Sequence, residues 1–147
     1  MQLNTFHFGK ITYDIEKEIL FTEGVPGFEE LKRYIMIEDE DVESPFCYLQ
    51  SVEDGDISFI MMNPYDVKAD YAPSIPKKCF EKLGNEADEH IILSIVAIPQ
   101  DIQSATINLQ APLLINLNTR KGMQVILEDT AYQTRHKLMA MLQREEE

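Results

Sequence analysis

The chain has 147 residues and a mass of 17.0 kDa, which suits one domain and allows a buried core without a metal or disulfide. Acidic residues number 26 against 13 Lys and Arg, so the formal net charge is −13. Binding to nucleic acid or to an anionic membrane through charge needs a basic surface, so this composition argues against both functions. A basic protein partner would instead be attracted by the long-range field.

Cysteine usage and the N-terminal residues predict a cytoplasmic protein. Cys47 and Cys79 form no CxxC pair, so zinc and thioredoxin-like sites have no support. The N-terminal residues lack the apolar run of a signal peptide, and the apolar run at residues 91–98 is too short to span a bilayer as a helix. In the cytoplasm both thiols would stay reduced.

Alternation of apolar and polar residues predicts strands along most of the chain. In chain order these are residues 11–16, 19–21, 34–37, 46–52, 57–62, 91–98, 105–111, 113–115 and 123–127. The acidic stretch 53–56 supplies a hairpin turn, and 116–122 is a basic, turn-rich loop. Residues 91–98 are apolar on both faces, which predicts a central and fully buried strand.

Two helices are expected. Ser74 is the candidate N-cap of the first, with Pro76 in its first turn and Gly84 at its end. The second covers about residues 130–143, followed by acids that oppose the helix dipole, so 143–147 should be a frayed acidic tail. The pattern predicts a mainly β fold, a single-domain small barrel or sandwich of about eight or nine antiparallel strands, one short helix and a C-terminal helix or tail, over residues 1–147.

The search for chemistry yields no catalytic, cofactor-binding or metal-binding residue. Phosphate-loop, dinucleotide, nucleophile-elbow and zinc-protease motifs are missing, and His7, His90 and His136 share no ligand spacing. The acids of 53–56 fail as a calcium loop, because Val52 would fall at a ligand position. An enzyme stays open, since triads assemble across a fold, and the alternative is a small acidic hydrolase with carboxylates on a barrel rim.

Two segments are candidate surfaces. The first is an acidic patch that either keeps the protein soluble or docks a basic partner, comprising Glu38, Asp39, Glu40, Asp41 and Glu43. The second is residues 63–71, where two tyrosines alternate with acids. Exposed tyrosines beside carboxylates suit protein recognition, and the alternative is that Tyr65 and Tyr71 only cover the core.

Several short stretches, in order along nearly the whole chain, resemble the FliW family of flagellar assembly factors. They are residues 21–29 (FTEGVPGFE), 45–51 (PFCYLQS), Phe59 with Asn63 and Pro64, 108–116 (NLQAPLLIN), 122–127 (GMQVIL), and Tyr132 with Arg135 and His136. The resemblance implies a small, β-rich cytoplasmic protein without enzymatic activity or cofactor. It also implies chaperone-like binding of flagellin, and binding and antagonism of the RNA-binding translational regulator CsrA, which represses flagellin translation.

The resemblance implies that partner switching relieves that repression when flagellin is exported. The chain alone is expected to be a monomer. Antagonism of the regulator leaves two routes open: the acids occupy its RNA site, or the protein docks elsewhere and disfavours the RNA-bound state. The resemblance favours the second route. A flagellin segment would bind as a helix in a groove or as a strand added to a sheet edge, and the groove would be bordered by Phe28, Pro64, Tyr65 and Tyr71. The full set of candidate partner-binding residues is Phe28, Glu29, Asn63, Pro64, Tyr65, Asp66, Asp70 and Tyr71.

Overall fold

The computed structural model describes residues 1–128 and 131–146, with the backbone alone for 143–146. The strands are β1 (Gln2–Thr5), β2 (Gly9–Thr12), β3 (Ile19–Phe21), β4 (Arg33–Glu38), β5 (Phe46–Ser51), β6 (Ser58–Met62), β7 (His90–Ala97), β8 (Thr106–Ile107), β9 (Leu113–Asn116), β10 (Lys121–Gln124) and β11 (His136–Lys137). The helices are α1 (Lys77–Leu83) and α2 (Leu138–Glu146), with short 3-10 turns η1 (Ile15–Lys17), η2 (Pro64–Asp66) and η3 (Ile102–Ser104).

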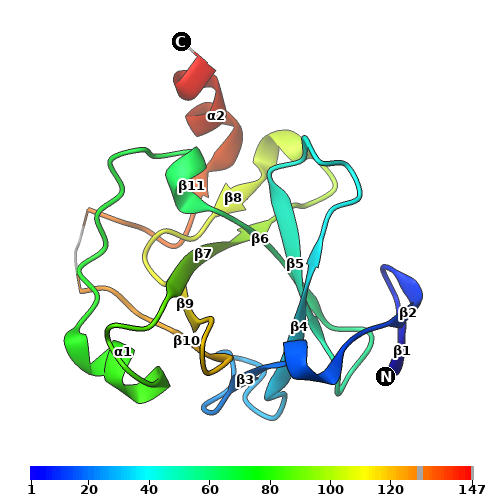
Figure 1. Cartoon of the computed structure of the whole chain (residues 1–147). Helices are drawn as coiled ribbons and strands as arrows, with labels where there is room; N and C mark the ends of the chain where they lie inside the picture. The colour runs from blue at the N-terminus through cyan, green and yellow to red at the C-terminus, as the bar shows by residue number, and fades with distance from the viewer. Residues whose placement is uncertain (129–130, 147) are drawn as a thin grey trace.

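Seven strands close into a barrel (Figure 1). They pair in the order β7, β6, β5, β4, β3, β10 and β9, and β9 pairs back onto β7. Strands β8 and β11 extend the sheet beyond β7, and β1 pairs with β2 in a separate hairpin. The predicted mainly β barrel is therefore confirmed.

One pairing departs from the expected antiparallel pattern. Strand β10 runs parallel to β3, with Gly122 opposite Phe21. The two strands are about 100 residues apart in the chain, so no tight turn fixes their relative direction. A Cβ on Gly122 would approach the ring of Phe21 within 2.7 Å, so the glycine lets these two strands close the barrel.

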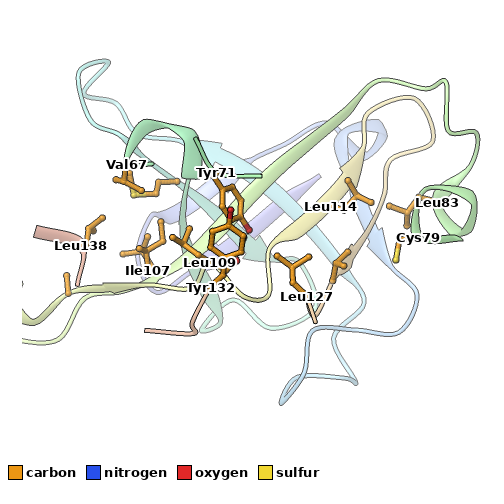
Figure 2. Close-up of a cluster of buried hydrophobic side chains, with 14 residues drawn as sticks. Val67, Tyr71, Cys79, Leu83, Ile107, Leu109, Leu114, Leu127, Tyr132 and Leu138 are labelled. Atoms are coloured by element: carbon orange, nitrogen blue, oxygen red, sulfur yellow. Dashed lines mark hydrogen bonds between the residues drawn. The ribbon is translucent and has the colours of Figure 1, made fainter. Parts of the chain in front are cut away.

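Alternation along the barrel strands produces two hydrophobic cores, because successive side chains of a strand point to opposite faces. The inner core fills the barrel with residues of β3 to β7 and β9: Ile19, Phe21, Tyr34, Leu49, Met61, Leu93, Leu113 and Ile115, joined by Val25. The outer core lies on the opposite sheet face and includes Met62, Val96 and Leu114 together with residues of α1, α2 and the loops (Figure 2). Residues 113, 114 and 115 alternate between the two.

The predicted strands agree best with the structure where one face of the strand is buried and a hairpin turn follows it. Residues 34–37, 46–52 and 57–62 correspond to β4, β5 and β6, with a turn at 53–56 as expected. Strand β7 is central, as predicted, because it pairs with β6, β8 and β9. It is not fully buried, since Ala97 is exposed and several of its isoleucines are half-buried. Strand β10 begins at Lys121, two residues before the predicted start.

Two predicted strands are shorter than the alternation suggested. In both, a side chain accepts hydrogen bonds from nearby backbone amides, which then do not pair with a neighbouring strand. The strand expected at 11–16 ends at Thr12, where the Asp14 carboxylate accepts from the Glu16 amide and opens η1. In the stretch 105–111 only Thr106–Ile107 is strand, and the Asn108 side chain accepts from the Gln110 and Ala111 amides. The described residues contain eleven strands against the eight or nine expected.

The predicted helix ends are partly wrong. Helix α1 begins at Lys77 after Pro76, without a side-chain cap, so Ser74 is not the N-cap; its end at Gly84, with φ +146°, is confirmed. The second helix begins at Leu138, because His136 and Lys137 pair with β8 instead. Its expected start at Thr130 lies outside the described residues, as do the side chains of the predicted tail 143–147.

Candidate functional site

Phe28 and Glu29 lie in the loop between β3 and β4. The Phe28 side chain is 38% exposed and its ring meets Phe59 edge-on, with centroids 5.2 Å apart. The Glu29 carboxylate accepts from the Gly27 amide at 3.0 Å, and this hydrogen bond lowers the pKa of Glu29. The loop therefore presents an aromatic edge and a carboxylate, held in place from the inner core.

Residues 63–66 form a second, compact feature after β6. The Asn63 side chain accepts from the Tyr65 amide at 3.0 Å and caps η2. Pro64 is buried, whereas Tyr65 is 41% exposed and Asp66 is exposed. The η2 turn therefore exposes Tyr65 to solvent, and the buried Pro64 anchors the turn in the protein.

Tyr71 belongs to the core. It is 3% exposed, its hydroxyl donates to the Leu109 carbonyl at 2.7 Å, and its ring packs 4.8 Å from that of Tyr132 (Figure 2). Burial raises its pKa. Of the two interpretations of Tyr71, an exposed recognition residue or a residue that covers the core, the structure supports the second, because its partners, Leu109 and Tyr132, approach from distant parts of the chain.

Tyr71 nevertheless supports the exposed ring of Tyr65, whose centroid is 5.7 Å away. Asp70 stands beside this pair and is bridged to Lys68 at 3.0 Å, which lowers the pKa of Asp70. A shallow hollow of about 390 Å³ borders Tyr65, lined by Asn63, Tyr65, His90, Ile91, Ile92 and Leu93. Of the residues expected to border a groove, Tyr65 lines this hollow.

The predicted residues do not gather into one contact cluster. Phe28 packs against Phe59 on the inner core, whereas Tyr65 packs against Tyr71 on the outer core. Pro64 and Tyr71 are buried and expose almost no surface. The structure therefore divides the candidate residues between two separate surfaces.

The acidic patch follows β4 and forms one wall of a cleft. Glu38, Glu40, Asp41 and Glu43 are exposed, and Asp39 is half-buried. The Asp39 carboxylate accepts from the Asp41 amide at 3.0 Å and from the Tyr48 hydroxyl at 3.3 Å; the first of these bonds lowers its pKa most. The cleft has a volume of about 470 Å³ and is lined by His7, Phe8, Ile11, Ile37, Glu38, Asp39, Glu40 and Tyr48.

The sequence reasoning missed the opposite wall of that cleft. His7, Phe8 and Ile11 come from the β1–β2 hairpin, and the Phe8 ring packs edge-on against Tyr48 at 5.1 Å. The aromatic run of residues 6–8 beside a glycine turn is a signal for such a hairpin. Three carboxylates line the cleft with no Lys or Arg among its lining residues, so it suits a cationic ligand group.

The described residues hold little that suggests catalysis. They contain no group of three or more His, Cys, Asp or Glu side chains placed to hold a metal ion. Burial raises the pKa of Cys47 to about 11, so its thiol is protonated near neutral pH. Among the described helices, none combines the length and the apolar character that crossing a membrane requires.

Comparison with known proteins gives one consistent result. Residues 2–138 match the family model described as FliW protein. "Flagellar assembly factor FliW" of Alkaliphilus metalliredigens is 41% identical over 148 residues, covering 100% of this chain and 91% of the relative. That of Caldicellulosiruptor saccharolyticus is 41% identical over 136 residues, covering 92% and 88%. The solved "Crystal structure of the flagellar assembly factor FliW" superposes with a TM-score of 0.87 at 31% identity, covering 94% of this chain and 96% of the other.

Proposed function

The chain belongs to the FliW family, and from that premise we propose that it is a flagellar assembly factor that binds flagellin and, in exchange, the translational regulator CsrA. Binding to the regulator relieves its repression of flagellin translation. The match to named assembly factors along nearly the whole chain is the observation that carries this proposal. Assembly is a role without catalysis, so we propose a cytoplasmic binding protein with no enzymatic activity and no cofactor.

Charge supports the second partner. A regulator that binds RNA needs basic surface, and this chain has a net charge of −13. Part of that charge is concentrated in the acidic patch, where Glu38, Glu40, Asp41 and Glu43 are exposed. Complementary charge accelerates encounter and excludes anionic competitors, and it is compatible with either route of antagonism. If the protein docks away from the RNA site, the two ligands are linked by a coupling free energy.

For flagellin we propose the surface around Tyr65. The exposed ring stands beside the apolar hollow of Ile91 and Ile92, and such rings are the usual anchors of protein interfaces. Asn63, Pro64 and Tyr71 hold this turn in place, whereas Asp66 and Asp70 form its acidic rim. Phe28 and Glu29 offer a second contact surface on the other core.

Titration calorimetry with purified flagellin tests the assignment. Tyr65→Ala should weaken binding about tenfold or more, as truncation of a hot-spot tyrosine typically does. Phe6→Ala is the matched control, since Phe6 is 76% exposed and lies near Gly55 at the opposite end of β6. Wild-type protein that binds no flagellin would contradict the proposed function, and equal losses in the two variants would contradict the surface.

The salt dependence of regulator binding tests the electrostatic part. We expect the affinity for CsrA to fall as salt rises from about 0.05 to 0.5 M, because exposed charges are screened beyond a Debye length of about 8–10 Å near physiological strength. The measurement is a dissociation constant at four salt concentrations. An affinity independent of salt would contradict attraction by the acidic surface.

A further inference from the structure

A continuous groove runs between the N-terminal hairpin and strand β4. The acidic cleft described above adjoins a second hollow of about 300 Å³, and the two share Ile11 and Ile37 as lining residues. The second hollow is more apolar, with Ile35 and Met36 on the β4 side and Tyr13 on the hairpin side, and one carboxylate and one amine, Asp14 and Lys17, also line it. The groove thus has an apolar end and an acidic end.

Strand β4 has an open edge along this groove. It pairs with β3 only through Arg33 and Tyr34, because the chain before Ile19 turns into η1. Pairing with β5, in contrast, extends over Tyr34–Glu38. Beyond Tyr34, therefore, one side of β4 lacks a neighbouring strand within the described residues.

Hydrogen-bond alternation identifies which backbone groups face that open side. The Arg33 carbonyl accepts a hydrogen bond from the Val52 amide. By the alternation of an antiparallel pair, the backbone N–H and C=O groups of Ile35 and Ile37 therefore also face β5. The backbone groups of the alternate residues face the opposite side of β4. The amides and carbonyls of Met36 and Glu38 therefore face the open side, and the described hydrogen bonds give them no partner there.

The hairpin keeps the groove open. Phe8 packs on Tyr48, and the Phe6 amide donates to the Gly55 carbonyl at 3.0 Å, so the hairpin is fastened to β5 and to the turn that follows it. Gly55 permits this approach, since a Cβ there would collide with the Asn4 carbonyl oxygen. The hairpin therefore lies over β5 and leaves the β4 edge free.

We propose that this groove binds an extended, basic peptide segment of a partner protein, which pairs as an added strand with Met36 and Glu38. Main-chain hydrogen bonds to the β4 edge provide the affinity, and alternate side chains provide the specificity. One end of the segment places Lys or Arg between the aromatic rings and the carboxylates of Glu38, Asp39 and Glu40. Apolar side chains at the other end enter the second hollow, where Ile11, Tyr13 and Met36 line it.

The proposal rests on the proposed function only in taking a protein as the partner, and a synthetic peptide tests it alone. The probe is a fluorescein-labelled heptapeptide, Lys-Thr-Val-Lys-Val-Thr-Lys, and its control replaces each Lys by Glu. Fluorescence anisotropy should show binding of the basic peptide and at least tenfold weaker binding of the acidic one. Equal binding of the two peptides would overturn the assignment of charge.

A matched pair of variants separates charge from strand pairing. Glu38→Gln removes the charge but keeps the amide, and should weaken binding about two- to fivefold, as loss of one exposed ion pair does. Glu38→Pro removes the charge and, in addition, the backbone N–H that faces the open side of β4. It removes no β4–β5 hydrogen bond, and it should weaken binding about tenfold more than Glu38→Gln does. Thermal unfolding checks that both variants are folded. Equal affinities of the two variants would overturn strand addition.

Amide hydrogen exchange gives an independent measure in the wild-type protein. Saturating basic peptide should slow exchange at Met36 and Glu38 at least tenfold, with smaller changes at Ile35 and Ile37, which already pair with β5. Uniform protection, or none, would overturn the pairing. Failure of the peptide while flagellin and CsrA still bind would refute this inference alone, whereas peptide binding without either protein would refute the proposed function.

Discussion

Among single residues, Tyr71 joins the candidate surface to the core. Tyr71→Phe removes the hydroxyl that satisfies the buried Leu109 carbonyl, so we expect a loss of roughly 1–3 kcal/mol in the free energy of unfolding. Urea unfolding measures it. Tyr65→Phe is the matched control, since the described hydrogen bonds do not involve its hydroxyl and its ring is exposed; the expected change is below about 0.5 kcal/mol. Equal losses would contradict the assignment of Tyr71 to the core.

Asp88 couples stability to pH. Its carboxylate accepts from Asn116 and from the Asn85 amide, both at 2.9 Å, and these bonds lower the pKa of Asp88 below its ordinary value of 3.8. A lowered pKa contributes stability above pH 3.8, and this is lost as the pH falls through the folded value. Asp88→Asn keeps an acceptor without the titration.

We therefore expect the free energy of unfolding of Asp88→Asn to fall less than that of the wild type between about pH 5 and about pH 2.5. Urea unfolding at several pH values measures the difference. The control is Asp66→Asn, because that exposed carboxylate accepts no hydrogen bond among the described contacts. Parallel pH profiles for the wild type and Asp88→Asn would contradict the prediction.

Residue type and local pattern were not enough to predict which side chains are exposed. The alternation of tyrosines and acids in 63–71 indicated a recognition surface, and Tyr65 with Asp66 and Asp70 is exposed as that reading requires. Tyr71 has the same local context but is buried, because the partners that bury it lie 38 and 61 positions away. Local pattern contains no information on such contacts.

At the level of elements, one of the two contacts that fasten the N-terminal hairpin, the one to the turn after β5, requires a glycine at position 55. A Cβ at Gly55 would collide with the Asn4 carbonyl, so Gly55→Ala should release β1 and β2 from the barrel. Hydrogen exchange with mass spectrometry should show faster exchange in residues 1–13, with β4 to β6 still protected. Asp56→Ala alters the same turn without adding an atom toward Asn4, and should leave exchange unchanged. Unchanged exchange in Gly55→Ala would contradict the contact.

Elements were predictable where local and tertiary forces agree. Strands β4, β5 and β6 combine alternation with a turn-forming acidic stretch, and were found within a residue or two. The failures at 11–16 and 105–111 arise where Asp14 and Asn108 bond their own backbone and end the ladder. The wall of the acidic cleft that the β1–β2 hairpin forms was not predicted, because no local signal shows that the hairpin lies over β5.

For the molecule as a whole, the barrel's sheet is shared by two cores. Leu113 faces the inner core and Leu114 the outer one, and both are fully buried on the same strand, β9. The two proposed partner surfaces are divided in the same way, since Phe28 packs on the inner core and Tyr65 on the outer core. Both cores pack on the same sheet, so unfolding of that sheet disrupts both of them. We therefore expect the two cores to unfold together.

Leu113→Ala and Leu114→Ala test that coupling. Each removes a fully buried leucine, so each should cost roughly 2–5 kcal/mol in the free energy of unfolding. Far-ultraviolet circular dichroism and tyrosine fluorescence, undisturbed by tryptophan, should report one coincident transition in both variants. Ile126→Ala, at a 68% exposed position, is the control and should change stability by less than about 0.5 kcal/mol. A second transition in either leucine variant would mean that the two cores fold separately, and that residues 1–147 are not one domain.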